Sequence, residues 1–292
     1  MREHERETVD FEVWPEAIEL GEMFAEEGYE LALVGGPVRD LLLHRRSHDL
    51  DFCTSARPEQ FEPILRRWGH DGFWDMGRKF GTLGAMRRRP NGTEVQVEIT
   101  TYRSDEYDPD SRKPEVSYGD SLEGDLSRRD FTVNAMALRV PDLEFVDPFG
   151  GANDLSKRVL RTPVDPRQSF DDDPLRMMRA VRFVAQLGFG IEPETAEAIC
   201  TMADRLGIVS AERVRDELVK LLLSDRPRAG IEAFVDSGLA DVVFPEIPAL
   251  QLEIDEHHRH KDVFEHTMIV IDRAVALETG PDGPVPAPDL TL

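Results

Sequence analysis

The sequence predicts an α+β protein in which a mixed sheet with helices comes first and an all-helical region follows. Up to about residue 150, apolar stretches with strand-like alternation interleave with amphipathic stretches of helical period. From about Asp171 onward only the helical period remains. Strands first and helices afterwards are typical of an α+β domain followed by a helical one. A chain of 292 residues is long enough for one large domain or two to three smaller ones.

Extended and helical stretches alternate in the first part of the chain. WPEAIELGEMFAEEG (14–28) predicts an amphipathic helix, and the apolar YELALVGG predicts a strand that ends in a tight turn. The following stretches predict a helix with proline in its first turn, a strand, a helix, and a strand pair about Asn91-Gly92: PVRDLLLHR, DLDFCT, ARPEQFEPILRRWG, and FGTLGAMRR with EVQVEITTYR. The polar segment 103–121 predicts a flexible loop.

The second part of the chain is expected to contain no strands after the turn EFVDPFGG. Four amphipathic stretches predict its helices: DPLRMMRAVRFVAQLGF, EPETAEAICTMADRLG, SAERVRDELVKLLLSD and PRAGIEAFVDSGLADVVF.

Composition excludes several classes of protein. Acidic residues number 58 against 35 basic ones, a net charge of −23, so a general basic surface for polyanions is excluded and a nucleic acid would have to contact a local basic patch. No apolar run is long enough for a membrane span, and the charged start MREHERETVDF is unlike a secretory signal. The two cysteines, Cys53 and Cys200, lack metal-ligand spacing. We therefore expect a cytoplasmic protein without a membrane partner.

Three acidic residues are candidates for catalysis and metal binding. Side chains alternate along a strand, so Asp49 and Asp51 project to one side of DLDFCT, and Glu98 faces away from the core side of EVQVEIT. If the two strands are neighbours, the three carboxylates converge. Such oxygen ligands suit Mg²⁺, and two metals at Asp49 and Asp51 would activate an attacking hydroxyl and stabilise the leaving pyrophosphate of a nucleotide. The alternative is that the aspartates satisfy turns or solvent at a strand end.

The Gly35-Gly36 turn shortly before these aspartates favours the first interpretation. Glycines permit a close approach of the backbone, and the N-terminus of the following helix offers free N–H groups to a phosphate. Arg39, one turn into that helix, can add a charge-assisted contact. The turn would thus hold the triphosphate.

The order of several motifs resembles that of class II tRNA nucleotidyltransferases (CCA-adding enzymes) and the related bacterial poly(A) polymerases. The motifs are GGPVRDLLL…HDLDF, GDLSRRDFTVNAMAL, DPFGG, DDDPLRMMRAVRF and SAERVRDEL, spread over roughly residues 30–275. The resemblance implies a polymerase-β-like nucleotidyltransferase head over 12–151, a helical neck over 152–225 and the beginning of a helical body over 226–292. It also implies template-independent transfer of CMP and AMP from CTP and ATP to the 3′ end of tRNA.

The resemblance also implies roles for individual residues. Arg129 matches an arginine that contacts the nucleotide, and Asn134 matches a residue that helps to shape the sugar site. Asp173 and Arg176 match the pair that reads the incoming base. Arg179 and Arg182 match further nucleotide contacts, and Glu212 and Arg213 look like the family's next motif.

The spacing of the arginines in DDDPLRMMRAVRF has a simpler interpretation as well. Arg176, Arg179 and Arg182 recur every three residues along one side of a helix, where arginines usually only contact solvent. Asp172 or Asp173 would cap this helix, with Pro174 at its first position. The family commonly has Glu-Asp where this chain has Asp172-Asp173, which leaves the role of Asp172 open.

Two alternatives to CCA addition remain at this stage. One is a poly(A) polymerase, or a partial enzyme that adds only CC or only A; GRKFGTLGAM is closer to the tRNA-type G-x-x-F-G-T pattern. The other is a non-catalytic RNA-binding protein, which should have lost a metal carboxylate. Near the end, His257, His258, His260 and His266 resemble the opening of an HD-type phosphohydrolase region, but the His-Asp dyad that would complete it is absent, so we expect no metal there.

Overall fold

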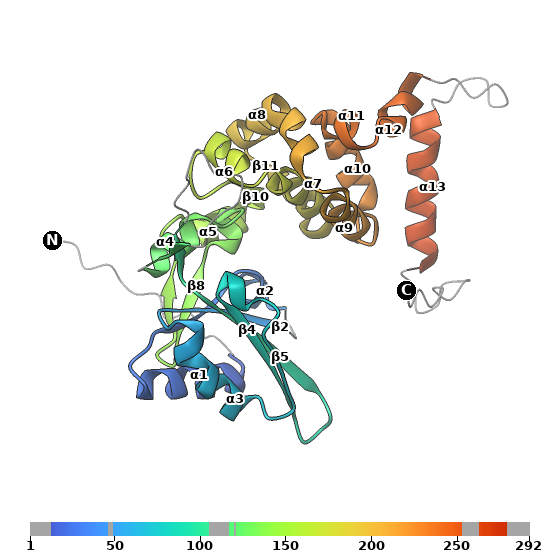
Figure 1. Ribbon diagram of the computed structural model, residues 1–292. Helices are drawn as coiled ribbons and strands as arrows, with labels where there is room; N and C mark the ends of the chain where they lie inside the picture. Colours follow the sequence, from blue (N-terminus) through green and yellow to red (C-terminus); the bar gives the residue numbers. More distant parts are fainter. Residues whose placement is uncertain (1–12, 46–48, 105–116, 120, 253–262, 279–292) are drawn as a thin grey trace. The chain divides into compact units, whose positions relative to one another are not determined.

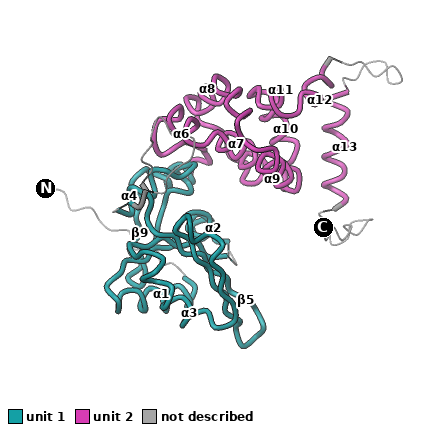
Figure 2. Tube along the Cα trace, in the orientation of Figure 1, with its two compact units in different colours: residues 1–155 teal, residues 156–292 magenta. Residues whose placement is uncertain are grey.

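The computed structural model describes residues 13–45, 49–104, 117–119, 121–252 and 263–278. The chain forms two compact units, residues 1–155 and 156–292 (Figure 2). The division predicted at 151–152 falls within helix α5 (Gly151–Lys157), the helix in which the first unit ends. The finer division between neck and body at residue 225 stays a prediction.

The first unit is built on a seven-stranded mixed sheet of order β3-β4-β5-β2-β1-β8-β9 (Figure 1). All neighbouring strands are antiparallel except β2 and β5, which are parallel. The strands are β1 (Leu31–Val34), β2 (Asp49–Thr54), β3 (Gly72–Trp74), β4 (Thr82–Arg88), β5 (Glu94–Thr101), β8 (Ala137–Val140) and β9 (Glu144–Val146).

The two faces of this sheet differ in what covers them. Helices α1 (Pro15–Glu26) and α3 (Pro58–Trp68) pack on the face into which Leu33, Phe52 and Val97 are buried. The alternate strand residues face the other side, where α4 (Leu122–Ser127) covers a smaller apolar cluster that includes Cys53 and Tyr102. Period-two alternation therefore separates a core face from a second face with open positions. The short helices of the unit are α2 (Gly36–Leu42), η1 (Arg78–Phe80) and η2 (Thr132–Asn134).

The ends of the predicted loop 103–121 are paired. Strands β6 (Arg103–Ser104) and β7 (Ser117–Tyr118) form a two-stranded antiparallel ribbon. Residues 105–116 and 120, the centre of the predicted loop, lie outside the described residues.

The second unit is mainly helical, and α7 lies at its centre, in contact with α6, α9 and α10. Its apolar face, which includes Met178 and Val181, is buried, as the helical spacing predicts. The helices are α6 (Pro166–Asp172), α7 (Leu175–Leu187), α8 (Pro193–Met202), η3 (Ala203–Ile208), α9 (Ala211–Leu222), α10 (Pro227–Asp236), α11 (Leu239–Val243), α12 (Glu246–Ala249), η4 (Leu250–Leu252) and α13 (Val263–Glu278). None of the helices in the described ranges is both long and apolar enough to cross a membrane.

One sequence prediction for the second unit was wrong, and one of its helices was missed. Strands do not stop after EFVDPFGG, because β10 (Val159–Leu160) pairs in parallel with β11 (Gly190–Ile191). Helix α6 was not predicted, although Asp165 caps it through the N–H groups of Arg167 and Gln168 and Pro166 follows at its first position. That cap-and-proline signal is present in the sequence.

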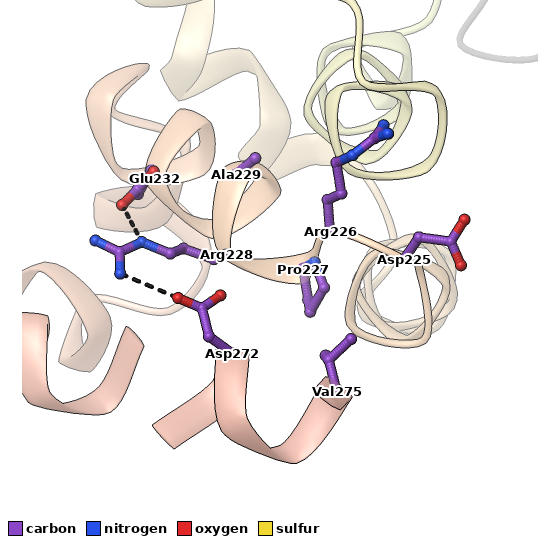
Figure 3. A pocket seen from close by; sticks show the side chains of 8 residues that line it. All are labelled: Asp225, Arg226, Pro227, Arg228, Ala229, Glu232, Asp272 and Val275. Carbon is purple, nitrogen blue, oxygen red and sulfur yellow. Dashed lines mark hydrogen bonds and ion pairs between the residues drawn. The ribbon is translucent and has the colours of Figure 1, made fainter. Parts of the chain in front are cut away.

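Arg228 connects α10 with α13 at the edge of the second unit. Its guanidinium donates to Glu232 on its own helix (2.8 Å) and to Asp272 (3.1 Å) and Glu265 (2.9 Å) on α13. These carboxylates raise the pKa of Arg228, so it remains charged. Figure 3 shows the adjacent cavity of about 260 Å³, lined by Asp225, Arg226, Pro227, Arg228, Ala229, Glu232, Asp272 and Val275. Three acids against two arginines make it a poor site for an anion.

Arg228→Gln should loosen the contact between α13 and α10. Amide hydrogen exchange in residues 263–278 should become several-fold faster, while exchange in the buried α7 stays unchanged. Added salt should reduce the difference between variant and parent, because exposed ion pairs are screened. Arg215→Gln is the matched control, since Arg215 pairs with its neighbour Asp216 on the same helix, α9. Unchanged exchange in α13 would show that its apolar contacts alone hold it.

Candidate active site

The three predicted carboxylates lie together on the face of the sheet opposite α1 and α3. Strands β2 and β5 are adjacent and parallel, with Asp51 directly opposite Glu98 and Asp49 opposite Gln96. Asp49, Asp51 and Glu98 are exposed, while Leu50 and Val97 between them are buried. The structure therefore confirms that the three carboxylates lie on the same face of neighbouring strands, as the alternation of side chains predicts.

The carboxylates are close enough to influence one another. Protein atoms crowd the Asp51 side chain although it keeps contact with solvent, and this desolvation raises its pKa; Glu98 and Asp49 raise the pKa further, whereas Arg129 opposes the shift. Among the described residues no three His, Cys, Asp or Glu side chains are gathered tightly enough to hold a metal ion by themselves. The donors nevertheless fit Mg²⁺, which is usually bound by one or two carboxylates together with water and substrate phosphates.

Gly35 is required at the turn before α2 for two reasons. Its φ of 74° and ψ of −133° are accessible essentially to glycine alone. A Cβ there would also lie 2.9 Å from Nη1 of Arg129. The sequence predicted that this turn makes room for a phosphate; the structure shows that it also makes room for an arginine.

Arg129 is held beside the turn by a buried acid. Asp125, which is fully buried, accepts from Nη2 of Arg129 (3.1 Å) and from Arg128 (2.5 Å). Burial alone would raise the pKa of Asp125, but the two guanidiniums lower it, so the carboxylate is ionised. Arg129 is thereby fixed as a cation on the acid-bearing side of the sheet.

Arg39 and Asn134, predicted from different motifs, contact each other directly. Nη1 of Arg39 donates to Oδ1 of Asn134 (2.8 Å), and Nδ2 of Asn134 donates to Asp130 (3.0 Å). Arg39 also pairs with its neighbour Asp40. Because α2 has only seven residues, its dipole is small, and positive charge at the turn comes mainly from Arg39 and Arg129.

In the second unit, Asp173 lies in extended backbone between α6 and α7. Its Oδ1 accepts from the N–H of Leu175 (3.2 Å), and its Oδ2 accepts from Nη2 of Arg213 on α9 (3.1 Å). Helix α7 begins at Leu175 with Pro174 as its N-cap residue, so the prediction that Pro174 is the first helical residue was wrong by one position. Asp173 precedes the N-cap residue but still accepts from the first N–H of the helix, and Arg213, named from the next motif, is its partner. Asp172, the alternative cap, is the last residue of α6. Ser210 is the N-cap residue of α9, and its side chain makes no capping hydrogen bond.

The arginines of α7 are not a solvent-facing row. Arg176 is buried, and its Nη1 donates to the carbonyl (3.2 Å) and the hydroxyl (2.8 Å) of Ser169. Arg182 is also buried and is bound by Glu217, and Arg179 is half-buried beside Phe183. The interpretation of these residues as merely solvent-contacting was therefore wrong for Arg176 and Arg182. Buried guanidiniums with fixed partners are placed reproducibly, as recognition requires.

Comparison with known proteins identifies the family. A sequence profile described as the poly A polymerase head domain matches residues 31–161, and one described as the probable RNA and SrmB-binding site of polymerase A matches residues 188–250. CCA-adding enzymes of Lactobacillus johnsonii and Streptococcus pneumoniae are 40% and 41% identical over 233 and 236 residues, 80% of this chain. The chain belongs to the family of CCA-adding enzymes and bacterial poly(A) polymerases.

Solved structures of the family have the same fold. The Bacillus stearothermophilus CCA-adding enzyme in complex with CTP matches with a TM-score of 0.68 and 36% identity, over 78% of this chain and 53% of that one. The Thermotoga maritima CCA-adding enzyme complexed with tRNA matches with a TM-score of 0.65 and 26% identity, over 92% and 64%. The chain spans 56% of the length of the two curated relatives above.

Some partners of the candidate residues in each unit were not assigned from the sequence. Asp125 and Glu217 are buried partners of arginines that were predicted from the sequence, Arg129 and Arg182. Only Asp125 could have been found from the sequence, because it lies three and four residues before two arginines. Trp74 beside Glu98 gave no signal. His266 lies on α13, and His257, His258 and His260 lie outside the described residues.

Proposed function

We propose that this chain transfers CMP and AMP from CTP and ATP to the 3′ end of tRNA without a nucleic-acid template. The main support is the register that places Asp51 opposite Glu98, with Asp49 on the same face. The relatives named CCA-adding enzymes, and the solved relatives named in complex with CTP and with tRNA, support this substrate class. Action on tRNA and the expected absence of a membrane partner fit a cytoplasmic enzyme.

Mg²⁺ is the proposed cofactor, held by Asp49 and Asp51 with Glu98 as the third carboxylate. When bound, it would supply charge that lowers the pKa of the attacking hydroxyl and neutralises the leaving pyrophosphate. Arg129 and Arg39 are proposed to contact the triphosphate. Their guanidinium groups lie beside Gly35 and Gly36 respectively, which supports this role.

Base choice is proposed to depend on α7. Cytosine and adenine both present an amino donor beside a ring-nitrogen acceptor, whereas uracil and guanine present the reverse. A carboxylate at Asp173 that accepts from the amino group and a guanidinium at Arg176 that donates to the ring would select C and A. The contacts of Asp173 with Arg213 and of Arg176 with Ser169 support fixed positions for both groups. Arg179 and Arg182 are proposed as further nucleotide contacts.

Asp173→Ala should weaken discrimination against UTP by roughly 10- to 100-fold, since one bidentate-type contact contributes about 1–3 kcal/mol. The ratio of kcat/KM for CTP to that for UTP on a tRNA primer measures this. Asp171→Ala is the control, because Asp171 is exposed and pairs with Arg205. An unchanged ratio in a folded Asp173→Ala protein would show that Asp173 caps the helix but does not select the base.

A poly(A) polymerase, or an enzyme that adds only CC or only A, is the second candidate, because the matching profile carries the polymerase description. Purified protein should be given tRNA that ends before C, after CC or after CCA, with each labelled NTP separately. Incorporation of C on the first primer and of a single A on the second supports the proposal. Long A tracts on arbitrary RNA would support the polymerase instead.

A further inference from the structure

Trp74 reaches the candidate active site from the edge strand β3. Trp74 is opposite Gly84 of β4, Gly84 is opposite Glu98 of β5, and Glu98 is opposite Asp51 of β2. Residues directly opposite in neighbouring strands share a face of the sheet. The four residues therefore form one row across four strands, and Trp74 lies on the same face as the carboxylates.

The indole crosses β4 because position 84 has no side chain. A Cβ at Gly84 would lie 2.0 Å from Cε2 and 2.1 Å from Nε1 of Trp74, so no other residue fits under the ring in this position. The ring spans the strand, and its Nε1 comes within 3.4 Å of Oε1 of Glu98. Tryptophan is a donor only, so the bond holds the carboxylate as acceptor.

This contact has a clear consequence for Glu98. The side chain of Glu98 is exposed on its strand and belongs to a flexible residue type, so without a partner it would sample several rotamers. A donor on one oxygen restricts those rotamers and leaves the lone pairs of the other oxygen available. The donor is neutral, so it adds no positive charge that would compete with a cation.

We propose that Trp74 is a positioning residue for Glu98: its indole passes over Gly84 and its N–H fixes the third carboxylate in the row with Asp51. The inference rests on the proposed function, in which Glu98 completes the catalytic carboxylates. It assigns a role to an aromatic residue outside the nucleotide-binding motifs.

Trp74→Phe removes the donor but keeps an aromatic ring over Gly84. In single-turnover CMP incorporation it should lower the maximal rate about fivefold to tenfold and leave the KM for CTP within about twofold, since the lost bond is to a charged group of the chemical step. Gly84→Ala should act in the same direction, because its methyl group displaces the indole. Phe73→Leu is the matched control: Phe73 precedes Trp74, and its ring contacts Arg66 on the other face.

A double-mutant cycle separates positioning from simple packing. If Trp74 acts through Glu98, Trp74→Phe should change the rate less than about twofold when Glu98→Ala is already present. An equally large effect in both backgrounds would overturn the proposal, as would a Trp74→Phe enzyme as fast as the parent. A parent chain that adds no nucleotide would contradict the proposed function, and the positioning role with it.

The contact itself has a readout independent of activity. The chain has three tryptophans, so ¹⁵N-labelled protein should give three indole N–H resonances, and the one absent from Trp74→Phe is that of Trp74. Glu98→Ala should shift this resonance upfield through loss of the acceptor. The indole N–H of Trp68 is buried without a hydrogen-bond partner in the described structure and should not move. An unshifted Trp74 resonance would overturn the proposal whatever the kinetics.

Discussion

Asp51→Asn is expected to lower the rate of nucleotide incorporation by about 10³-fold or more. The substitution keeps the size of the side chain but removes the negative charge of the carboxylate that neighbours both others, Asp49 on the same strand and Glu98 on the adjacent strand. Loss of preorganised charge stabilisation at such a position costs several kcal/mol in the transition state. Steady-state incorporation of labelled CMP with Mg²⁺ measures the loss.

The same substitution, Asp51→Asn, should increase the stability of the fold or leave it unchanged. Desolvation by surrounding protein atoms and two neighbouring carboxylates raise the pKa of Asp51 against the opposing effect of Arg129, which means that its ionised form is disfavoured in the folded state. A neutral residue there should therefore not destabilise the fold. Glu94→Gln is the control for loss of a charge from the same face of β5, and its salt bridge with Arg88 lies at the far end of the strand. Near-normal turnover by Asp51→Asn would contradict the proposed site.

Arg182→Met should destabilise the protein by about 3–5 kcal/mol, because the buried carboxylate of Glu217 loses its hydrogen-bonded partner and keeps, among the described residues, only the ion pair with the exposed Lys220 at 3.9 Å. The side chains of Arg182 and Glu217 are 10% and 8% exposed, and Nε of Arg182 donates to Oε2 of Glu217 at 2.5 Å. Nη1 also donates to Gln186 (2.6 Å), so the pair belongs to a small network between α7 and α9. Urea unfolding of the full chain, followed by circular dichroism, measures the loss.

Replacement of both partners distinguishes the free-energy cost of one unpaired buried charge from the stabilisation that the ion pair itself provides. Arg182→Met with Glu217→Leu removes both charges, and the double variant should recover most of the lost stability. Arg215→Met with Asp216→Leu, an exposed pair on α9, is the control and should change stability by less than about 1 kcal/mol. A double variant as unstable as Arg182→Met would show that packing rather than charge decides at this position.

The common face of Asp49, Asp51 and Glu98 could be predicted from the sequence because it depends on the alternation of side chains along each strand. Alternation places Asp49 and Asp51 on one side of a strand, and alternation with the apolar Val97 and Ile99 fixes the side that Glu98 takes. Only the adjacency of β2 and β5 had to be assumed, and the structure confirms it. The predicted strand DLDFCT has the bounds of β2, and the predicted strand EVQVEITTYR extends two residues beyond the end of β5 at Thr101.

Contacts between elements distant in the sequence could not be predicted in the same way. The burial of Arg176 and Arg182 depends on how α6 and α9 pack against α7, and helical spacing alone gives the side of a helix but not its neighbour. Trp74 was missed because its position depends on the empty space above Gly84 in another strand. The ribbon of β10 and β11 is too short, at two residues each, to produce a periodic signal.

The most direct test of the proposed activity is the sequence added to a tRNA that lacks its last three nucleotides. Purified chain, this tRNA, Mg²⁺ and all four NTPs should be incubated over a time course, and the 3′ ends sequenced. We expect C, then CC, then CCA to accumulate in that order, with no further extension and no U or G, and no products from the Asp51→Asn protein. Untemplated A tracts, incorporation of U or G at comparable rates, or equal products from the Asp51→Asn protein would contradict it.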